Sequence, residues 1–428
     1  LQGAPLPASI LETDILAARL EQYEPGDLDA VIGAGEVVWV GVEPLGERDG
    51  RVALYLADHL PRLLPPRIDE RPAPSSGARK PTPRTPAPQI PTPPAPGLPA
   101  RESALVEWLA ARGASFFAPL HEAAGGGYPA ETVDALWNLV WQGLVTNDGV
   151  HALRAFTKAR VTSRRRADRH ASTFRSRRLV PRSAEGRWAL VRPLDVETTS
   201  ARGTIAAQAR TRQQTTSWAA AATQQLLSRH GVVTRESIAA ETLPGGFGPV
   251  YTVMKAMEES GRIRRGYFVA GLGATQFAMP AALDLLRSMR DTPEDAQVVT
   301  LAATDPANPY GATLKWPGLD AAHGRGPTRT VGASVILVDG ALCGYLARGE
   351  RMLLAWVPDT EPQRTRVARA VARALVERAR SGGDTPRGML IEELNGVSAT
   401  LHPLASFCVE AGFTAGAMGL AATRARTS

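Results

Sequence analysis

The sequence predicts an α+β protein built from several small domains, and three observations carry this prediction. The chain has 428 residues, whereas a single domain usually has about 100 to 200. Hydrophobic residues make up 44% of it, which is enough to form real cores. Helical and strand-like hydrophobic patterns alternate along the chain, and segments rich in proline or arginine interrupt them. We therefore expect four folded modules and two segments without regular structure.

The first module is expected at residues 1–65. Ser9 and Glu12 have the spacing of a capping box at a helix start, and a second short helix is predicted at 25–35. Apolar residues then alternate in two runs between 36 and 56, which predicts two strands joined by a turn. Two helices followed by a two-stranded wing are the layout of the winged-helix variant of the helix-turn-helix motif.

Two segments are predicted to lack regular structure. About a third of residues 66–100 are proline, a density that no helix or central strand tolerates, so we expect a polyproline-like linker. Residues 160–182 hold nine arginines and one aspartate, so the charge of this segment exceeds the net charge of +7 of the whole chain. A flexible basic loop is therefore expected at 160–183.

The winged-helix pattern is predicted to recur at residues 101–159 and 184–290. In the second module the expected elements are helices at 103–112, 116–123 and 129–142 and a wing at 144–153. In the third they are a strand at 188–191, helices at 205–229, 234–241 and 247–260, and a wing at 262–280. Thr234 and Ser237 are the expected capping residues of the second of these helices.

The last module, residues 291–428, has a different pattern. Short β runs are separated by Gly, Asp or Pro, and one strongly amphipathic helix is expected at 361–380. This pattern predicts a compact, partly closed antiparallel sheet, that is, a β-barrel-like domain with one long helix.

Several classes of function are excluded by missing motifs. The sequence has no phosphate-loop motif, so this chain is not expected to hydrolyse ATP by itself. Cys343 and Cys408 are the only cysteines and the histidines are scattered, which argues against a disulfide framework and a zinc site. The most apolar stretch, 331–347, is too short and too interrupted to span a membrane. We expect a soluble protein with no metal and no cofactor of its own. Because it starts at Leu1 without an initiator methionine, we also expect it to be part of a longer polypeptide.

Nucleic-acid contact is predicted by the winged helices and by the excess of 49 Lys and Arg over 42 Asp and Glu. The candidate residues are basic or aromatic and lie in the third wing, the arginine loop and a polar loop after it: Arg262, Arg264, Arg265, Tyr267, Arg164, Arg165, Arg166, Arg177, Arg178, Lys315 and Trp316. Two alternatives stay open. The loop arginines could be an ordinary solvated charge run, and Tyr267 and Phe268 could alternate into a core.

The polar loop at 303–317, ATDPANPYGATLKWP, is a candidate for catalysis. Asp305, Asn308 and Tyr310 are held between prolines, which could fix a carboxylate in place to activate water. Asp-Pro and Asn-Pro are also common turn formers whose side chains cap their own backbone, and the turn interpretation is the stronger one.

Several passages resemble bacterial large helicase-related (Lhr) proteins. They include RHGVVTRESIAAETLPGGFGPVYTVMKAMEESGRIRRGYFVAGLGATQFAMP and LAATDPANPYGATLKWP. The resemblance implies the C-terminal region of an ATP-dependent DNA helicase, without the two RecA-like domains that would use ATP and Mg. It implies 3′-to-5′ movement on single-stranded or forked DNA, unwinding of RNA:DNA hybrids, a role in DNA repair, and a cytoplasmic, nucleoid-associated location.

The same resemblance implies tandem winged helices followed by a β-barrel-like domain, as in AlkZ-type DNA glycosylases, and assembly into a homotetramer. Excision of uracil from DNA is one alternative function. In that case Asp305 would be the carboxylate that activates water, with Asn308 and Tyr310 shaping the base pocket. A pure assembly scaffold is the other alternative.

Overall fold

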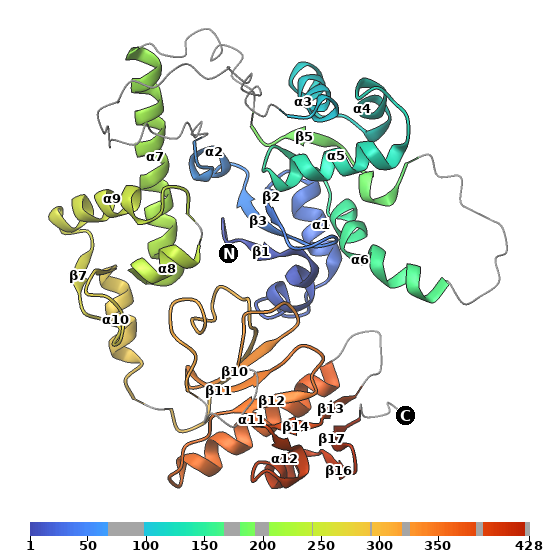
Figure 1. The fold of residues 1–428 in the computed structure, drawn as a ribbon. Helices are drawn as coiled ribbons and strands as arrows, with labels where there is room; N and C mark the ends of the chain where they lie inside the picture. The colour runs from blue at the N-terminus through green and yellow to red at the C-terminus, as the bar shows by residue number, and fades with distance from the viewer. Residues whose placement is uncertain are drawn as a thin grey trace, which may run out of the picture.

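The computed structural model has the α+β class that the sequence predicts, with winged-helix domains (Figure 1). The residues that it describes are 1–66, 98–166, 180–192, 205–241, 243–291, 293–318, 326–381 and 388–423. Most of the predicted linker at 66–100 and of the predicted basic loop at 160–183 lies outside them.

The first winged helix is built around a three-stranded sheet with the order β1-β3-β2. Its elements are β1 (Leu6–Pro7), the short helical turns Ala8–Ile10 and Leu11–Leu16, α1 (Pro25–Gly33), β2 (Val37–Pro44) and β3 (Gly50–Leu56), followed by α2 (Leu60–Leu63). The predicted capping box is wrong. The Ser9 hydroxyl donates to the Asp49 carboxylate at 2.5 Å instead of capping its own turn. Ser9 therefore ties the first helical turn to the wing.

The second module has three helices and then departs from the prediction. Its elements are α3 (Ala100–Arg112), α4 (Phe117–Ala123), α5 (Pro129–Trp141), β4 (Val145–Asn147), α6 (His151–Arg166), the turn Arg182–Ala184 and β5 (Trp188–Leu190). The predicted wing at 144–153 is wrong, because β4 pairs with the distant β5 and α6 lies between them in sequence. The Asn147 side chain accepts from Gly149 N at 3.0 Å and so fixes the turn that leads into α6. Since α6 continues to Arg166, the start of the predicted loop is helical.

The helices and the wing of the third module follow the prediction, but its predicted first strand at 188–191 does not belong to it, because that strand is β5 and pairs with β4 of the second module. Its elements are α7 (Ile205–His230), β6 (Val232–Thr234), α8 (Arg235–Ala240), α9 (Phe247–Glu259), β7 (Arg264–Gly266), β8 (Gln276–Ala278) and α10 (Pro280–Ser288). The strands form a sheet with the order β6-β8-β7. Thr234 and Ser237 form the predicted capping box: each side-chain oxygen accepts from the backbone N–H of the other, at 3.0 and 3.1 Å.

The C-terminal module contains a six-stranded sheet that stays open, so the β-barrel-like closure predicted from the sequence is not found among the described sheets. The sheet has the order β15-β14-β12-β11-β10-β9 and consists of β9 (Val298–Ala302), β10 (Ser334–Val338), β11 (Ala341–Leu346), β12 (Met352–Ala355), β14 (Glu393–Leu394) and β15 (Val397–Ser398). It is also mixed rather than antiparallel throughout, because β12 and β14 pair in parallel. Between β12 and β14 the chain passes through α11. Because β14 and β15 then add to the edge of the sheet opposite β9, the two edges do not meet and the sheet stays open.

The long helix α11 (Gln363–Ser381) covers this sheet and buries Val371 and Leu375 completely, as its amphipathic pattern predicts. A second, small sheet packs beside it with the order β13-β17-β16. The remaining elements of the module are β13 (Met389–Ile391), the turn Ala399–Leu401, α12 (Ala405–Ala411), β16 (Thr414–Gly416) and β17 (Gly419–Ala422).

The first and second modules share one hydrophobic core. Trp39 of β2 stacks on Trp137 of α5 with ring centroids 6.3 Å apart, and Trp137 meets Trp188 of β5 edge to face at 5.7 Å. All three indoles are almost fully buried in a single cluster that runs through both modules. At the seam, Gly41 of β2 lies so close to Val140 that a Cβ at this position would overlap the Val140 carbonyl.

In the part of the chain that the structure describes, none of the helices has the length and apolar character needed to cross a membrane. The same residues bring no three His, Cys, Asp or Glu side chains together in a way that could hold a metal ion.

We expect the substitution Gly41→Ala to destabilise the protein by about 1–3 kcal/mol, because the added methyl group must push β2 away from α5. The measurement is the free energy of unfolding in urea. Gly33→Ala is the matched control, because a Cβ at Gly33 meets nothing within 4 Å and the residue is already helical. That change should be neutral or stabilising by up to ~1 kcal/mol. Equal effects of the two variants would show that β2 and α5 are not in close contact.

Candidate nucleic-acid interface

The third module presents a wing next to a helix in the position of a recognition helix. Winged helices contact nucleic acid through the helix before the wing, here α9, and through the wing hairpin, here β7 and β8. A small core holds these elements together, with Val250 and Met254 of α9 and Phe277 of β8 all fully buried. This core fixes the position of the wing relative to the outer face of α9.

One buried amide, Gln276, organises the wing loop. Its Oε1 accepts from the backbone N–H groups of Phe268 and Val269 at 2.9 and 2.8 Å, and its Nε2 donates to the carbonyls of Val269 and Gly273. The side chain is fully buried. Four hydrogen bonds from one residue fix the loop before any ligand arrives, which lowers the entropy cost of binding. Gln276 is not among the residues predicted from the sequence. The sequence does contain a signal for its role, because Gln276 is a polar residue next to Phe277 in an otherwise apolar strand.

The predicted wing residues are all available to a ligand. Arg262, Arg264, Arg265 and Tyr267 are exposed, and the Tyr267 side chain is 66% accessible. Placing Tyr267 in a core is therefore wrong. The tyrosine hydroxyl also accepts from Gly271 N at 3.2 Å, which holds the ring against the wing loop. Three cations beside an exposed aromatic ring suit a nucleic-acid strand, whose phosphates pair with arginine and whose bases stack on aromatic rings.

The helix α9 itself adds little positive charge. Its exposed face carries Lys255, which lies 3.9 Å from Glu259, and the acidic Glu258 follows in the same turn. Of these two elements, the wing is therefore the cationic one.

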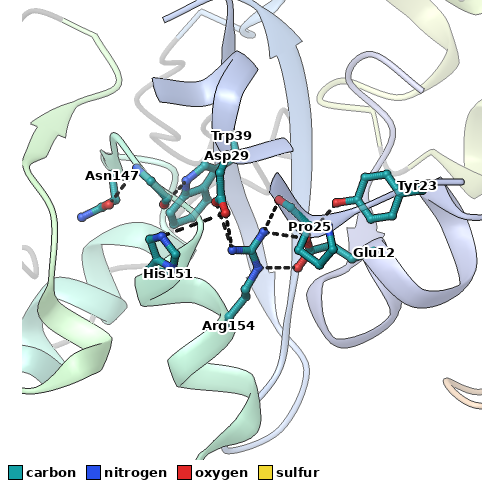
Figure 2. Close-up of polar contacts among 9 residues, drawn as sticks. Glu12, Tyr23, Pro25, Asp29, Trp39, Asn147, His151 and Arg154 are labelled. Carbon is teal, nitrogen blue, oxygen red and sulfur yellow. Dashed lines mark hydrogen bonds and ion pairs between the residues drawn. The ribbon is translucent and has the colours of Figure 1, made fainter. Parts of the chain in front are cut away.

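The first winged helix has the opposite polarity, and its recognition helix is already engaged. Figure 2 shows Arg154 of α6 reaching the acidic face formed by Glu12 and Asp29. Arg154 donates to both oxygens of Glu12 at 2.7 Å and to both oxygens of Asp29 at 2.8 and 3.0 Å. It also donates to the Pro25 carbonyl at the start of α1. One guanidinium thus docks the second module onto the helix that would otherwise face a ligand.

The Arg154 network is held in place by partial burial. The Arg154 side chain is only 15% exposed and Glu12 18%, so water screens the ion pair less than at the open surface. Its hydrogen bonds to Glu12 raise the pKa of Arg154 further, against the opposing effect of burial. The Tyr23 hydroxyl donates to Glu12 at 2.8 Å, and burial together with this bond raises the pKa of Tyr23. The cluster is therefore a charged joint between modules, with the tyrosine neutral.

The candidate catalytic loop is brought to the base of the first module. Asp305 is fully buried, and its two oxygens accept from Arg19 in a bidentate pair at 2.7 Å each. One of them also accepts from Ala307 N at 2.7 Å. Asn308 accepts from Tyr310 N and donates to the Ala303 carbonyl, as the turn interpretation predicts. This is the geometry of a structural ion pair and an Asx-type turn.

The other predicted residues are spread out. Lys315 is exposed at the end of the same loop, whereas Trp316 is part-buried, stacked against Tyr310 and edge-on to Tyr345. Arg164, Arg165 and Arg166 lie in the last turns of α6, but their side chains are outside the description. Arg177 and Arg178 lie outside the described residues altogether.

Comparison with known proteins gives two family matches, both described as winged-helix domains of the large helicase-related protein. They cover residues 1–57 and residues 212–298, the first and third modules of this chain.

Two curated relatives extend over nearly the whole chain. A protein of Mycolicibacterium smegmatis named "Lhr helicase/ probable uracil glycosylase" is 36% identical over 408 residues, which is 94% of this chain and 24% of the relative. A protein of Escherichia coli K12 named "Lhr helicase/uracil glycosylase" is 32% identical over 441 residues, 98% of this chain and 25% of the relative. The chain thus spans about a quarter of the length of these relatives.

The Arg154 joint yields a stability prediction. We expect Arg154→Ala to lower the free energy of unfolding by about 1.5–3 kcal/mol, because it leaves two carboxylates without their charged partner. Arg154→Lys should recover only part of this loss, since an ammonium cannot make the bidentate contacts. The measurement is urea unfolding of the purified chain.

The control is Arg187→Ala. Arg187 pairs with Asp148 at 2.6 Å, but the two side chains are 56% and 38% exposed. Such a surface pair contributes at most about 1 kcal/mol. A loss at Arg154 no larger than the loss at Arg187 would contradict the role of Arg154 as a joint.

Proposed function

We propose that this chain, which belongs to the large helicase-related family, binds nucleic acid through the wing of its winged helix at residues 212–298. The observation that carries the proposal is the exposed cluster of Arg262, Arg264, Arg265 and Tyr267 on a hairpin that Gln276 holds rigid. The arginines supply phosphate contacts and the tyrosine supplies a stacking surface.

The strand is expected to engage this winged helix rather than the first one. The α1 helix of the first module carries Asp27 and Asp29, and its acidic face is bound by Arg154 of α6. A phosphate backbone would have to displace that arginine and then meet the carboxylates it leaves behind. We therefore assign the first winged helix to contact between modules.

The wider role follows from the family. We propose that the chain is the nucleic-acid-binding part of an ATP-dependent helicase that moves 3′-to-5′ on single-stranded or forked DNA, acts on RNA:DNA hybrids, and serves DNA repair. ATP and Mg would then be used by motor domains outside this chain. Assembly into a homotetramer and a cytoplasmic, nucleoid-associated location belong to the same proposal.

Base excision is the second activity in the names of both relatives. The geometry gives no support to Asp305 as its catalytic carboxylate. Both of its oxygens are engaged by Arg19 and the backbone, and Asp305 lines neither the cavity beside Trp218 nor the cavity beside Thr304. We therefore propose nucleic-acid binding and not catalysis through Asp305.

Salt dependence tests the wing. Replacing Arg262, Arg264 and Arg265 together by Gln should weaken binding to a single-stranded oligonucleotide and flatten the plot of log affinity against log salt. For single strands each lost phosphate contact lowers the slope by about 0.7, so three contacts correspond to about 2. The measurement is fluorescence anisotropy over a range of salt concentrations.

The matched control replaces three exposed arginines of the C-terminal module, Arg348, Arg364 and Arg369, by Gln. This variant loses the same charge and should keep the slope of the unmodified chain. A wing variant whose slope stays unchanged would rule out the wing as the phosphate-contacting surface.

Stacking is tested separately at Tyr267. Tyr267→Ala should weaken binding by about tenfold, since stacking of one base on an aromatic ring contributes about 1–3 kcal/mol. The salt slope should not change, because no charge is removed. Tyr267→Phe keeps the ring and should keep most of the affinity. Equal affinities for all three proteins would exclude stacking at this position.

A further inference from the structure

A second feature of the chain lies away from the wing, where three modules meet. A partly open cavity of about 120 Å³ lies between the first module, the end of α7 with α8, and the loop after β9. Its polar lining residues come from all three: Arg51, His230, Glu241, Thr304, Asn308, Thr313 and Arg329.

Arg329 carries a charge that its contacts do not neutralise. The guanidinium donates to three backbone carbonyls, those of Asp305, Asn308 and Tyr310, at 2.7 to 3.1 Å. Carbonyl groups hold only partial charges. Burial lowers the pKa of Arg329, the charge of Arg51 lowers it further, and the Asp305 carboxylate acts in the opposite direction. The positive charge of Arg51 thus acts on Arg329 at this cavity, which both residues line.

Thr304 supplies an unused hydroxyl at the same place. Its Oγ1 is buried and has no hydrogen-bond partner among the described residues. A buried hydroxyl without a partner is unfavourable, and such groups in folded proteins need an explanation. Thr304 lines the cavity, so a ligand oxygen there would provide the missing partner once the side chain turns its hydroxyl toward it.

The one carboxylate in the lining is already paired. Glu241 accepts from Arg229 and lies 2.8 Å from His230 Nε2. Burial by itself would raise the pKa of Glu241, but His230 and Arg229 outweigh it and hold the pKa below its usual value. Glu241 is therefore ionised and its charge is balanced by its own neighbours. Arg51 donates from one of its nitrogens to Glu43, in an ion pair whose side chains are 37% and 45% exposed. Arg329 therefore contributes the main uncompensated positive charge to the lining, and the remaining donors of Arg51 add to it.

We propose that this cavity is a binding site for a phosphate group, held by the guanidinium groups of Arg51 and Arg329 and by the Thr304 hydroxyl. Arginine suits this role because its fork of N–H donors matches the oxygens of a phosphate. The phosphate belongs either to a nucleic-acid strand or to a small molecule. Because its three ligand groups come from two modules, the bound anion would also fasten the first module to the C-terminal loop.

The test is calorimetric titration of the full chain with inorganic phosphate at constant ionic strength. Saturable binding with one site per chain is expected. Thr304→Val removes the hydroxyl with little change of shape, and Arg51→Gln removes one charge. Each should weaken phosphate binding by about tenfold or more, as expected for loss of a hydrogen bond that involves a charged group.

Thr304→Val also separates binding from folding. Because the Thr304 hydroxyl has no partner in the empty cavity, its loss should leave the melting temperature in chloride buffer unchanged or raised. Arg48→Gln is the matched control for Arg51→Gln, since Arg48 is exposed on the same hairpin and does not line the cavity. It should bind phosphate like the unmodified chain. No saturable binding, or equal binding by all variants, would overturn the proposal.

A competition experiment identifies the source of the phosphate. A 5′-phosphorylated dinucleotide and the same dinucleotide with a 5′-hydroxyl are titrated in the presence of inorganic phosphate. Displacement by the phosphorylated form alone supports a strand end, and displacement by both supports a backbone phosphodiester. Displacement by neither supports a small phosphate compound. Variants of the wing are not involved, so failure of the wing proposal would leave these results intact.

Discussion

The packing of β2 against α5 is the constraint on which the rest of the structure depends. Backbone meets backbone where Gly41 lies against Val140, and this approach lets Trp39, Trp137 and Trp188 form one buried cluster. The same seam is locked by polar contacts, since Thr146 donates to the Trp39 carbonyl at 2.6 Å and Trp39 donates to the Gly149 carbonyl at 3.2 Å. With these modules joined, Arg154 reaches α1 from α6 and Arg19 reaches Asp305 from the first module. The joined pair is the platform that positions the other modules.

Local sequence patterns predicted the parts of the fold that depend on local interactions. The capping box of Thr234 and Ser237 formed as expected because both partners lie within one helical turn. The equivalent pattern at Ser9 and Glu12 failed, because Asp49 and Arg154, distant in sequence, hold these two side chains instead. The pairing of β4 with β5 and the parallel pairing of β12 with β14 also join strands separated by a helix. Periodicity identifies such strands but not their partners.

The residues of the candidate site also fall into those that local sequence predicts and those that depend on distant partners. The wing arginines are exposed, as their place in a short, charged hairpin predicts, whereas the sequence left open whether Tyr267 lies at the surface or in a core. The role of Asp305 could not be decided from its own loop, because its partner Arg19 lies 286 residues earlier in the chain. The cavity with Arg51, Thr304 and Arg329 could not be predicted either, since no pattern in the sequence places these three residues together. The prolines and asparagine of the loop predict that it forms a turn. The charged partners of the loop, such as Arg19, come from distant parts of the chain and cannot be predicted from the loop itself.

The opposite polarity of the two winged helices has a kinetic consequence. The acidic helix α1 and the basic strand β7 belong to different modules of the chain and lie well apart in Figure 1. An approaching polyanion is repelled at one and attracted at the other, and charges of this kind act over roughly a Debye length, about 8–10 Å at physiological salt. For the proposed nucleic-acid ligand, this difference favours first encounters at the wing over encounters at α1. Under that proposal the first winged helix would influence the orientation of association without contacting the ligand.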